Sequence, residues 1–403
     1  MLRPYLIRAV ALFISILSVA ACEDDTADTT PDEVVKEDSL KNDTTVVDTV
    51  IVDTTVIDTT DIDTVIVDTT VVDTVIVDTV VTDTVTNEDT TVVVNPYPGN
   101  TNKWTTIQAA DGSQPVERHE AAFIEVKNKF YLLGGRGIRP VSIFDPATQK
   151  WSEGAKPPKE LHHFQPIVWD DKVYILGAFT GGFPRETPTA NIYIYDPAVD
   201  TWSVGAEVPA NRRRGSAGVV VYDNKFYVAC GVVNGHTDGH QKWFDVYDPA
   251  TNSWSVLPDA PRERDHFQAV VADHKLYLAA GRLSKVDNNV FANTIGEVDV
   301  YDFKSGQWTT LADPIPTQRA GTAATLYKGE VIIAGGESDK QNPAHSEVEA
   351  LNPDSHQWHA MPPLVEGRHG SGLIVWKGMI FIASGCGIRG GKPELKTMEY
   401  YSE

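Results

Sequence analysis

The sequence predicts an all-β protein in which the last three quarters of the chain form a closed ring of six four-stranded sheets, a β-propeller. Tryptophans recur there at intervals of 47, 51, 52, 54 and 50 residues, at Trp104, Trp151, Trp202, Trp254, Trp308 and Trp358. Five of them follow an Asp or Asn turn by six residues, and β-rich runs ending in glycine precede these turns. A period near 50 residues indicates an array of equivalent supersecondary units.

Each unit is expected to contain four strands. An alternating strand comes first and is introduced by a basic residue, at Arg118, His162, Arg214, Arg264, Arg319 or Arg368. The second strand ends in glycine, as at Gly135, where a side chain would hinder the bend. The third strand is aromatic and ends in a turn such as Asp145-Pro146, because Pro presets φ and Asp bonds nearby backbone. The fourth strand carries the tryptophan.

This pattern resembles the kelch repeat and recurs six times over residues 97–403. The departures from the repeat are small: Ala178 replaces a second glycine, and Cys230 and Ala280 precede single glycines. The resemblance implies a six-bladed kelch propeller in which the first strand of every blade lines a central channel. The fold alone does not imply a function, since propellers include binding modules and enzymes.

The two ends of the repeat region predict how the ring closes. The unit that starts at Arg368 ends at Tyr401 without a tryptophan strand, and Trp104 has no blade before it. We therefore expect the N-terminal Trp strand to complete the last blade, since closure of the ring removes exposed sheet edges. Cys230 and Cys386 fall in blades three and six, on opposite sides of the ring, so buried thiols are expected rather than a disulfide.

Residues 1–21 have the pattern of a secretory signal, with Arg3 and Arg8 flanking the start of an apolar run that ends in small residues. Cys22 follows directly, and the junction resembles the lipobox of bacterial lipoproteins, in which this cysteine is lipidated. An ordinary signal peptide with a chance cysteine is the alternative. The acidic run 23–25 resembles an export signal of surface lipoproteins, so we expect a lipid anchor at the outer membrane of a bacterium, with the protein exposed at the surface.

Residues 22–96 are expected to form a disordered, low-complexity stalk. An Asp-Thr pair recurs every five residues, a period that gives neither a helix nor a strand an apolar face, and residues 23–96 carry 20 acids and two lysines. The pairs resemble acceptor sites of a bacterial O-glycosylation system, which implies glycans on Thr44, Thr49, Thr54, Thr59, Thr64, Thr69, Thr74, Thr79 and Thr84. An unmodified spacer and a pentapeptide β-solenoid are the alternatives.

The kelch resemblance places a ring of basic residues around one mouth of the channel. The expected ligand-binding residues are Arg118, Arg136, His162, Arg214, Arg264, Arg282, Arg319 and Arg368. Guanidinium groups bind carboxylate and phosphate in a planar, bidentate way. Because this arginine is part of the common repeat, about half of the set is expected to be structural. Nucleic acid is not favoured as a partner, since residues 97–403 are net negative.

Two functions remain open. One is a propeller, expected to be monomeric, that binds an acidic carbohydrate or a protein partner. The other is a sugar-acid mutarotase resembling the six-bladed N-acetylneuraminate epimerases, with Glu337, Asp265 or His266 as the acid or base. We expect no metal and no cofactor: the copper ligands of the oxidases related to galactose oxidase are not recognisable, and the histidines of loop 236–240 are interpreted as ordinary loop residues.

Overall fold

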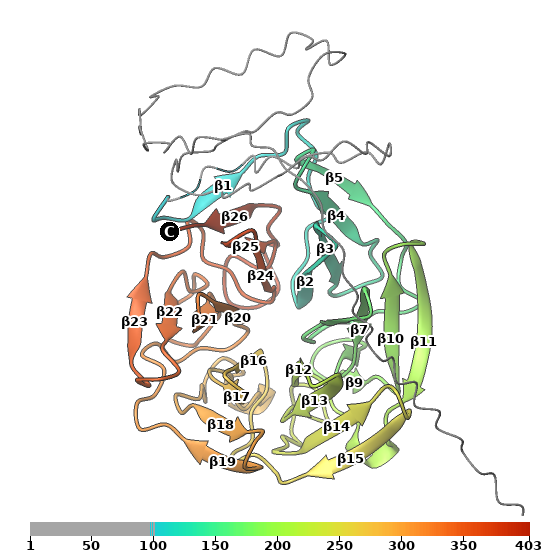
Figure 1. Ribbon diagram of the computed structural model, residues 1–403, viewed down its shortest axis with the longest axis vertical. Helices are drawn as coiled ribbons and strands as arrows, with labels where there is room; N and C mark the ends of the chain where they lie inside the picture. Colours follow the sequence, from blue (N-terminus) through green and yellow to red (C-terminus); the bar gives the residue numbers. More distant parts are fainter. Residues whose placement is uncertain (1–96, 98, 100) are drawn as a thin grey trace, which may run out of the picture. The chain divides into compact units, whose positions relative to one another are not determined.

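The computed structural model describes residues 97, 99 and 101–403, which form six four-stranded antiparallel sheets around a central channel (Figure 1). This confirms the prediction of an all-β, six-bladed propeller. In each blade the first strand lies nearest the channel, and these innermost strands contact one another in turn around the ring. The predicted segments 1–21 and 22–96, with Cys22 and the nine threonines, lie outside the described residues.

The first three blades are consecutive along the chain, and each has its four strands in order from the channel outward. Blade 1 contains β2 (Ala121–Val126), β3 (Lys129–Gly134), β4 (Ser142–Asp145) and β5 (Lys150–Glu153). Blade 2 contains β6 (Ile167–Trp169), β7 (Lys172–Ile175), β10 (Asn191–Asp196) and β11 (Thr201–Glu207). Blade 3 contains β12 (Gly218–Tyr222), β13 (Lys225–Ala229), β14 (Phe244–Asp248) and β15 (Ser253–Leu257).

The last three blades repeat this order and bring the chain back to blade 1. Blade 4 contains β16 (Ala269–Ala272), β17 (Lys275–Leu278), β18 (Asp299–Asp302) and β19 (Gln307–Thr310). Blade 5 contains β20 (Ala323–Tyr327), β21 (Glu330–Ala334), β22 (Val348–Leu351) and β23 (Trp358–Met361). Blade 6 contains β24 (Leu373–Trp376), β25 (Met379–Ala383) and β26 (Met398–Tyr401) from the C-terminal end, and β1 (Thr105–Ile107) from the N-terminal end.

The two ends of the described chain close the ring as predicted. Strand β1 pairs antiparallel with β26, with Thr105 opposite Tyr400 and Ile107 opposite Met398. Trp104 lies one residue before β1, is 3% exposed, and packs its ring 5.8 Å from that of Tyr401. Because β1 from one end of the described chain pairs with β26 from the other end, β26 has a partner on both sides and the last blade has four strands like the others.

The repeated residues have the same place in successive blades. The aromatic residue before the Asp turn lies directly opposite the tryptophan of the outer strand, as Tyr195 does with Trp202 and Tyr301 with Trp308. Such cross-strand aromatic pairs stabilise a sheet. Apolar side chains of adjacent blades pack against each other between the sheets. Cys230 is buried and unpaired, as is Cys386, which confirms that the two thiols form no disulfide.

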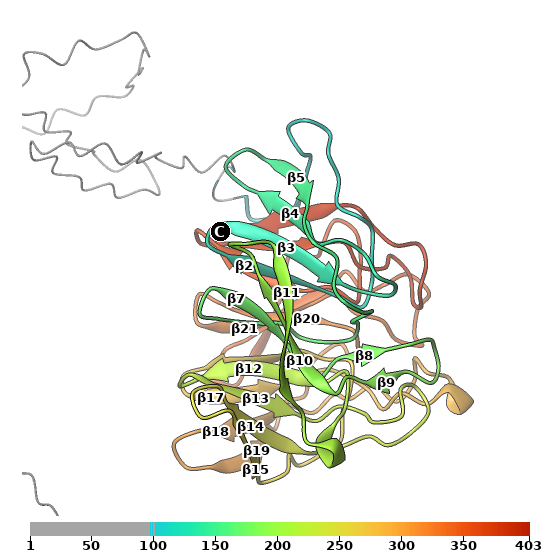
Figure 2. The same ribbon diagram turned by 90° about the vertical axis from the view of Figure 1, so that its right-hand side faces the viewer.

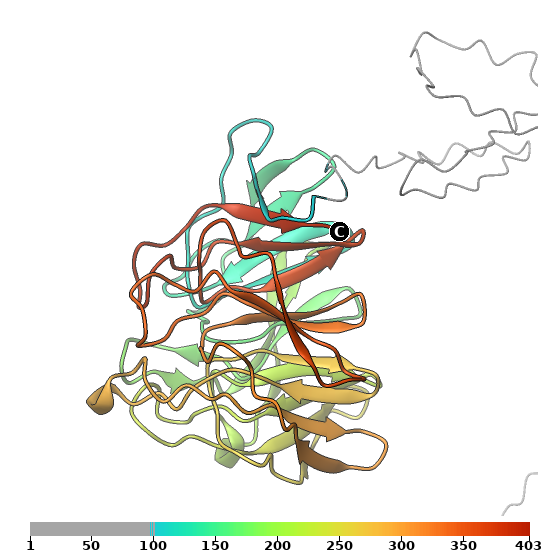
Figure 3. The ribbon, with the colours of Figure 1, turned by 90° about the vertical axis from the view of Figure 1, so that its left-hand side faces the viewer.

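Long connections between the second and third strands project from one face of the ring (Figures 2 and 3). In blade 2 this connection contains the short hairpin of β8 (Phe179–Thr180) and β9 (Thr187–Pro188), and in blade 4 it contains the 3-10 turn η3 (Val286–Asn288). A second 3-10 turn, η2 (Ala210–Arg212), precedes β12. Within the described part of the chain, no helix has the length and apolar character needed to cross a membrane.

Candidate functional site: a funnel at one mouth of the channel

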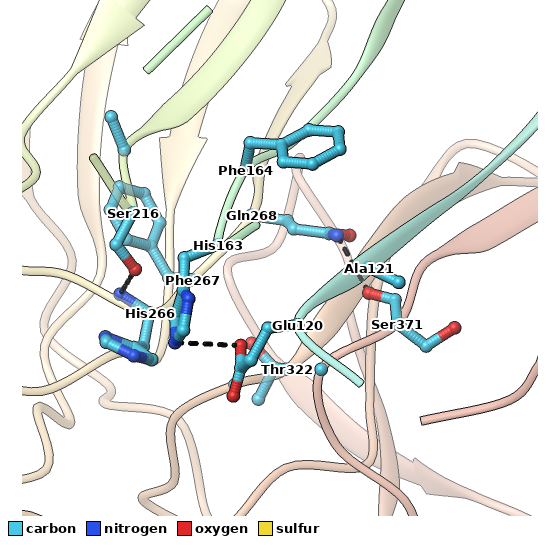
Figure 4. Close-up of a pocket in the computed structure, with 13 residues that line it drawn as sticks. Glu120, Ala121, His163, Phe164, Ser216, His266, Phe267, Gln268, Thr322 and Ser371 are labelled. Carbon is cyan, nitrogen blue, oxygen red and sulfur yellow. Dashed lines mark hydrogen bonds and ion pairs between the residues drawn. The ribbon is translucent and has the colours of Figure 1, made fainter. Parts of the chain in front are cut away.

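A belt of hydrogen bonds surrounds the channel just before the innermost strands. Six residues at equivalent places have positive φ: Glu120, His163, Ser216, His266, Gly321 and Gly370. In four places the N–H of one member donates to the carbonyl of the member in the preceding blade, as from His163 to Glu120 (3.0 Å) and from Gly321 to His266 (2.7 Å). His266 instead donates its N–H to the hydroxyl of Ser216 (3.0 Å). The belt holds the side chains of Glu120, His163 and His266 close together beside the channel (Figure 4).

Above this belt the channel widens into a funnel of about 540 Å³. Its wall combines basic, acidic, imidazole and aromatic side chains from all six blades, contributed by the belt and by the long connections. The lining residues are His119, Glu120, Arg136, His163, Phe183, His236, Arg282, Val290, Phe291, Glu337, Gly390, Gly391 and Lys392. A concave site with a few convergent polar groups and aromatic walls is typical of small-molecule binding.

Two of the eight predicted ligand-binding residues, Arg136 and Arg282, line the funnel. Arg136 comes from blade 1 and pairs with Glu186 at 2.6 Å, and its side chain is 23% exposed. Arg282 comes from blade 4 and pairs with Glu337, also at 2.6 Å. Each guanidinium therefore enters the funnel with a carboxylate beside it, so the wall is mixed in charge rather than uniformly basic.

The arginines that introduce the innermost strands lie elsewhere, inside the blades. Arg118, Arg214, Arg264, Arg319 and Arg368 are all at most 3% exposed and are not part of the funnel wall. Arg264 is typical, since it donates to the carbonyl oxygens of Ala280 (2.7 Å) and Glu297 (3.0 Å) and to Asp299 (2.7 Å). Their geometry gives these five arginines a structural role in joining the strands of a blade, whereas their contact with a ligand stays a prediction.

The sequence carries a signal for this structural role that the pattern of arginines alone does not reveal. In four blades the buried arginine pairs with an acid two residues before the third-strand aromatic or leucine: Asp245, Asp299, Glu349 and Glu399. In blade 1 the hydroxyl of Ser142 takes this place beside Arg118, at 3.2 Å. An acid at a fixed offset in the same repeat therefore identifies the arginines that are neutralised internally.

The position of His162 requires a correction of one residue. The first-strand arginines of blades 4, 5, 6 and 1 accept, at their carbonyls, the N–H of a glycine in the blade before, as Arg264 does from Gly231 (2.8 Å). In blade 2 the equivalent acceptor is Leu161, which receives the N–H of Gly135 at 2.9 Å. Leu161, not His162, therefore replaces the arginine, and both Leu161 and Tyr193 of this blade belong to one apolar cluster.

Glu337, a candidate acid or base, is held as a carboxylate by its neighbours. Its two oxygens accept hydrogen bonds from Arg282 (2.6 Å) and from the N–H of Gly390 (2.8 Å), and His369 Nε2 lies 3.4 Å away. Although burial opposes the shift, His369 and Arg282 lower the pKa of Glu337 to about 2. Burial lowers the pKa of His369, but the carboxylates of Glu337 and Glu120 outweigh it and raise this pKa to about 9. This pair supplies fixed charges at neutral pH.

Asp265 and His266 form a buried pair beneath the funnel. Asp265 accepts from His266 Nδ1, from the Ser284 hydroxyl (2.6 Å) and from His240 (3.2 Å), and it is fully buried. It therefore orients His266 rather than lining the cavity. Burial lowers the pKa of His266, so the ring is neutral and its Nε2 faces His236. Of these candidates, His266 is the one placed for proton transfer in the channel.

The belt and the funnel also contain residues outside the predicted ligand-binding and catalytic sets. Glu120 and His163 come from the belt, and His236 comes from the long connection of blade 3. His236 and His240 of that loop diverge, since His236 lines the funnel while His240 binds the carbonyl of Ser284 (3.0 Å). Glu120 and His163 could have been located in the sequence, because each lies two residues after an equivalent position, Arg118 or Leu161.

Fold and site together define a closed propeller with a small-molecule-sized funnel at one mouth, in which charged groups converge on partly aromatic walls. Comparisons with known proteins agree with this class. The family model described as "Attractin/LZTR1 beta-propeller" matches residues 83–338, and the Kelch motif model matches residues 318–365. The chain therefore belongs to the kelch-repeat β-propellers, and within them it matches the Attractin/LZTR1 propeller family.

Individual relatives show the same relationship. Kelch-like protein terF of Aspergillus terreus is 30% identical over 329 residues, which cover 75% of this chain and 69% of that protein. Kelch-like protein 35 of Mus musculus is 26% identical over 283 residues, and the chain spans 45% of its length. The solved structure titled "Structure of YjhT" shares the fold, with a TM-score of 0.60 and 17% identity over 71% of this chain and 96% of that one.

Proposed function

We propose that this propeller binds a small anionic ligand in the funnel, and that the ligand is an acidic carbohydrate. The observation that carries the proposal is the convergence of Arg136 and Arg282, from different blades, on one cavity of about 540 Å³. Guanidinium groups suit a carboxylate. A cavity of this volume suits a ligand of one or two sugar rings. Recognition of an acidic side chain of a protein partner is the alternative within the same site.

Aromatic side chains on the wall support a ring-shaped ligand. Phe183 is 53% exposed at the mouth and packs 5.1 Å from the ring of His236. On the opposite loops, the guanidinium of Arg282 lies 5.8 Å from the Phe291 ring, and that of Arg389 lies 5.5 Å from it. An exposed aromatic face beside fixed cations offers apolar contact to one side of a sugar while the cations hold its acidic group.

The test is a ligand screen of the protein against sialic acid, uronic acids, and sulfated and neutral glycans, followed by thermal shift and NMR. Acidic sugars are expected to stabilise the protein, and Arg136→Gln is expected to weaken that binding. Arg213→Gln is the matched control, because Arg213 pairs with Glu207 outside the funnel. Equal affinity in both variants, or stabilisation by neutral glycans alone, would contradict an anion site in the funnel.

A sugar-acid mutarotase is the second candidate, and the pair of Asp265 and His266 favours it. Opening and closing a pyranose ring requires a base and an acid. A neutral imidazole held by a buried carboxylate can exchange protons with a ligand at the base of the funnel. The readout is anomer exchange by NMR: His266→Gln should abolish acceleration while the funnel arginines still bind the sugar. Binding without faster exchange in the unmodified protein would exclude this candidate.

We further propose that the propeller acts at a bacterial cell surface, lipid-anchored at Cys22 and held away from the outer membrane by a stalk of residues 23–96. The acidic, glycine-free Asp-Thr repeats of this segment support a spacer role, and O-glycans on its threonines would keep β-prone runs apart. Membrane fractionation tests the anchor, since Cys22→Ser should release the protein. Intact-mass measurement tests the glycans, and protease treatment of whole cells tests surface exposure.

A further inference from the structure

Three buried imidazoles meet where the funnel joins the channel. His163, His236 and His266 come from three successive blades, and a ligand nitrogen of each lies within 4.8 Å of the other two. His163 and His236 line the funnel, and His163 and His266 line the narrower space below it (Figure 4). The three rings are therefore open to a solute that enters the funnel, although each residue is at most 4% exposed.

The hydrogen bonds of two of these rings determine where their protons lie. His236 Nδ1 is 2.9 Å from Glu186, and His266 Nδ1 contacts Asp265. Ionised carboxylates only accept hydrogen bonds, so both Nδ1 atoms carry a proton and donate it. When neither ring carries a second proton, both Nε2 atoms have lone pairs, and they face each other at 3.1 Å. A metal ion between them would then relieve the contact of two acceptors.

The third ring has the same orientation for a different reason. His162 Nε2 lies 3.0 Å from the carbonyl of Gly181, which only accepts, so His162 carries its proton there. The Nδ1 of neutral His162 is then an acceptor for the Nδ1–H of His163, 2.6 Å away. The remaining Nε2 of His163 has a lone pair and lies 3.4 Å from Glu120. All three Nε2 atoms are thus available as nitrogen donors in one cluster when no ring carries a second proton.

We propose that His163, His236 and His266 bind a late first-row divalent cation through their Nε2 atoms. Zn²⁺ is the ion that we expect. Zinc–nitrogen bonds of about 2.0–2.1 Å in a tetrahedron separate two ligand nitrogens by about 3.3 Å. The 3.1 Å between His236 and His266 and the 3.4 Å between His163 and Glu120 are close to this separation. Glu120 or a water in the funnel would provide the fourth ligand.

The carboxylates that hydrogen-bond to two of the imidazole rings also fit a metal centre. Metal-binding histidines usually donate their other N–H to a carboxylate or carbonyl, which fixes the ring and raises its basicity. Glu186 and Asp265 occupy these places behind His236 and His266. The site requires no particular ligand in the funnel, so this inference is independent of carbohydrate binding, whereas it competes with the mutarotase candidate for Nε2 of His266.

A second cluster in the same wall, Glu120, Glu337 and His369, does not have this character. His369 Nε2 faces the carbonyl oxygens of Ile388 (3.0 Å) and Gly390 (2.9 Å) and therefore carries a proton. Arg282 already neutralises Glu337 at 2.6 Å. Protonated nitrogen and an adjacent guanidinium oppose a metal ion, so the tri-histidine cluster is the favoured position.

The experiment loads chelator-treated full-length protein with Zn²⁺, removes the excess, and measures bound metal by elemental analysis and affinity by competition with a chromophoric chelator. One tightly bound zinc per chain is expected. Co²⁺ should give the visible spectrum of a tetrahedral nitrogen site, which separates this centre from weak carboxylate sites among the aspartates of residues 22–96. His163→Ala and His236→Ala should lose the tight site.

His345→Ala is the matched control, because His345 is also buried but is held by Ser338 and Glu347 in blade 5, and its variant should keep one zinc. Glu186→Gln keeps all three imidazoles and should weaken zinc binding by about 10–100-fold, which tests the site even where an alanine variant fails to fold. Zinc retained in His163→Ala, an octahedral cobalt spectrum, or no tight zinc at all would overturn the proposal.

Discussion

The guanidinium of Arg264 and the carboxylate of Asp299 lie 2.7 Å apart, and both side chains are fully buried. The pair connects the start of the innermost strand of blade 4 to its third strand. Equivalent pairs connect Arg214 with Asp245 (2.7 Å) and Arg319 with Glu349 (2.5 Å). The repeated arginine of this chain thus joins strands within one blade, and the charge of the funnel comes from other residues.

Replacement of the arginine in such a pair should therefore lower the free energy of unfolding without changing the funnel. Arg264→Met leaves buried Asp299 with Arg262 (2.8 Å) as its remaining guanidinium partner, so the lost charged hydrogen bond should cost about 1.5–3 kcal/mol of unfolding free energy. Chemical denaturation of the variant measures the loss. Lys127→Met is the control, since Lys127 is 70% exposed beside Asp171, and its midpoint should not change. An unchanged midpoint for Arg264→Met, together with lost ligand binding, would instead assign this arginine to the ligand site.

Alanine variants at two glycines with positive φ should distinguish the free-energy cost of the backbone conformation from the cost of steric crowding. A Cβ on Gly335 (φ +63) would lie 2.1 Å from the carbonyl oxygen of Arg368, whereas one on Gly329 (φ +84) would meet no atom within 4 Å. Alanine at Gly329 should cost about 1–2 kcal/mol for the left-handed conformation alone. Gly335→Ala should cost about 1–3 kcal/mol more than that, because its Cβ would also clash with the carbonyl oxygen of Arg368. Equal thermal midpoints for the two variants would contradict the close approach of blades 5 and 6.

Closure by the N-terminal strand makes Trp104 a stability determinant. Trp104 is buried with Tyr401 in the cluster between blades 5 and 6, so Trp104→Ala should cost about 3–5 kcal/mol. Trp254 in the outer strand of blade 3 is only partly buried, and Trp254→Ala should cost less. Urea denaturation of both variants checks the order, and a smaller loss for Trp104→Ala would mean that β1 contributes little to closure.

The two propeller thiols should be inert in the folded protein. Burial raises the pKa of Cys230 to about 12, and reaction requires the thiolate. Cys386 is fully buried and unpaired. In a Cys22→Ser background, a thiol reagent at pH 8 should label neither residue within the lifetime of the native state. After denaturation it should label both, and rapid labelling under native conditions would indicate that these blades open.

Local sequence was enough to predict the propeller. Each blade repeats its own tryptophan, Asp turn and glycine-ended strand, and these signals depend on neighbouring residues within about 50 positions. The unmatched Trp104 at one end and the incomplete unit ending at Tyr401 also predicted the closure, which the pairing of β1 with β26 confirms. The repeat makes the blades predictable because each one uses the same local packing of its tryptophan, turn and strands.

The tertiary structure alone decided which of the repeated residues face the funnel. Arg264 and Arg282 are both arginines near strand ends, yet the first turns into its blade toward Asp299 and the second turns toward Glu337 in the funnel wall. His163, His236 and His266 meet only because the ring brings three blades together and a positive φ at two of these residues orients their side chains. The contacts of the funnel, such as Arg282 with Glu337 and the meeting of the three histidines, cross blades, and a pattern read within one repeat contains no information about them.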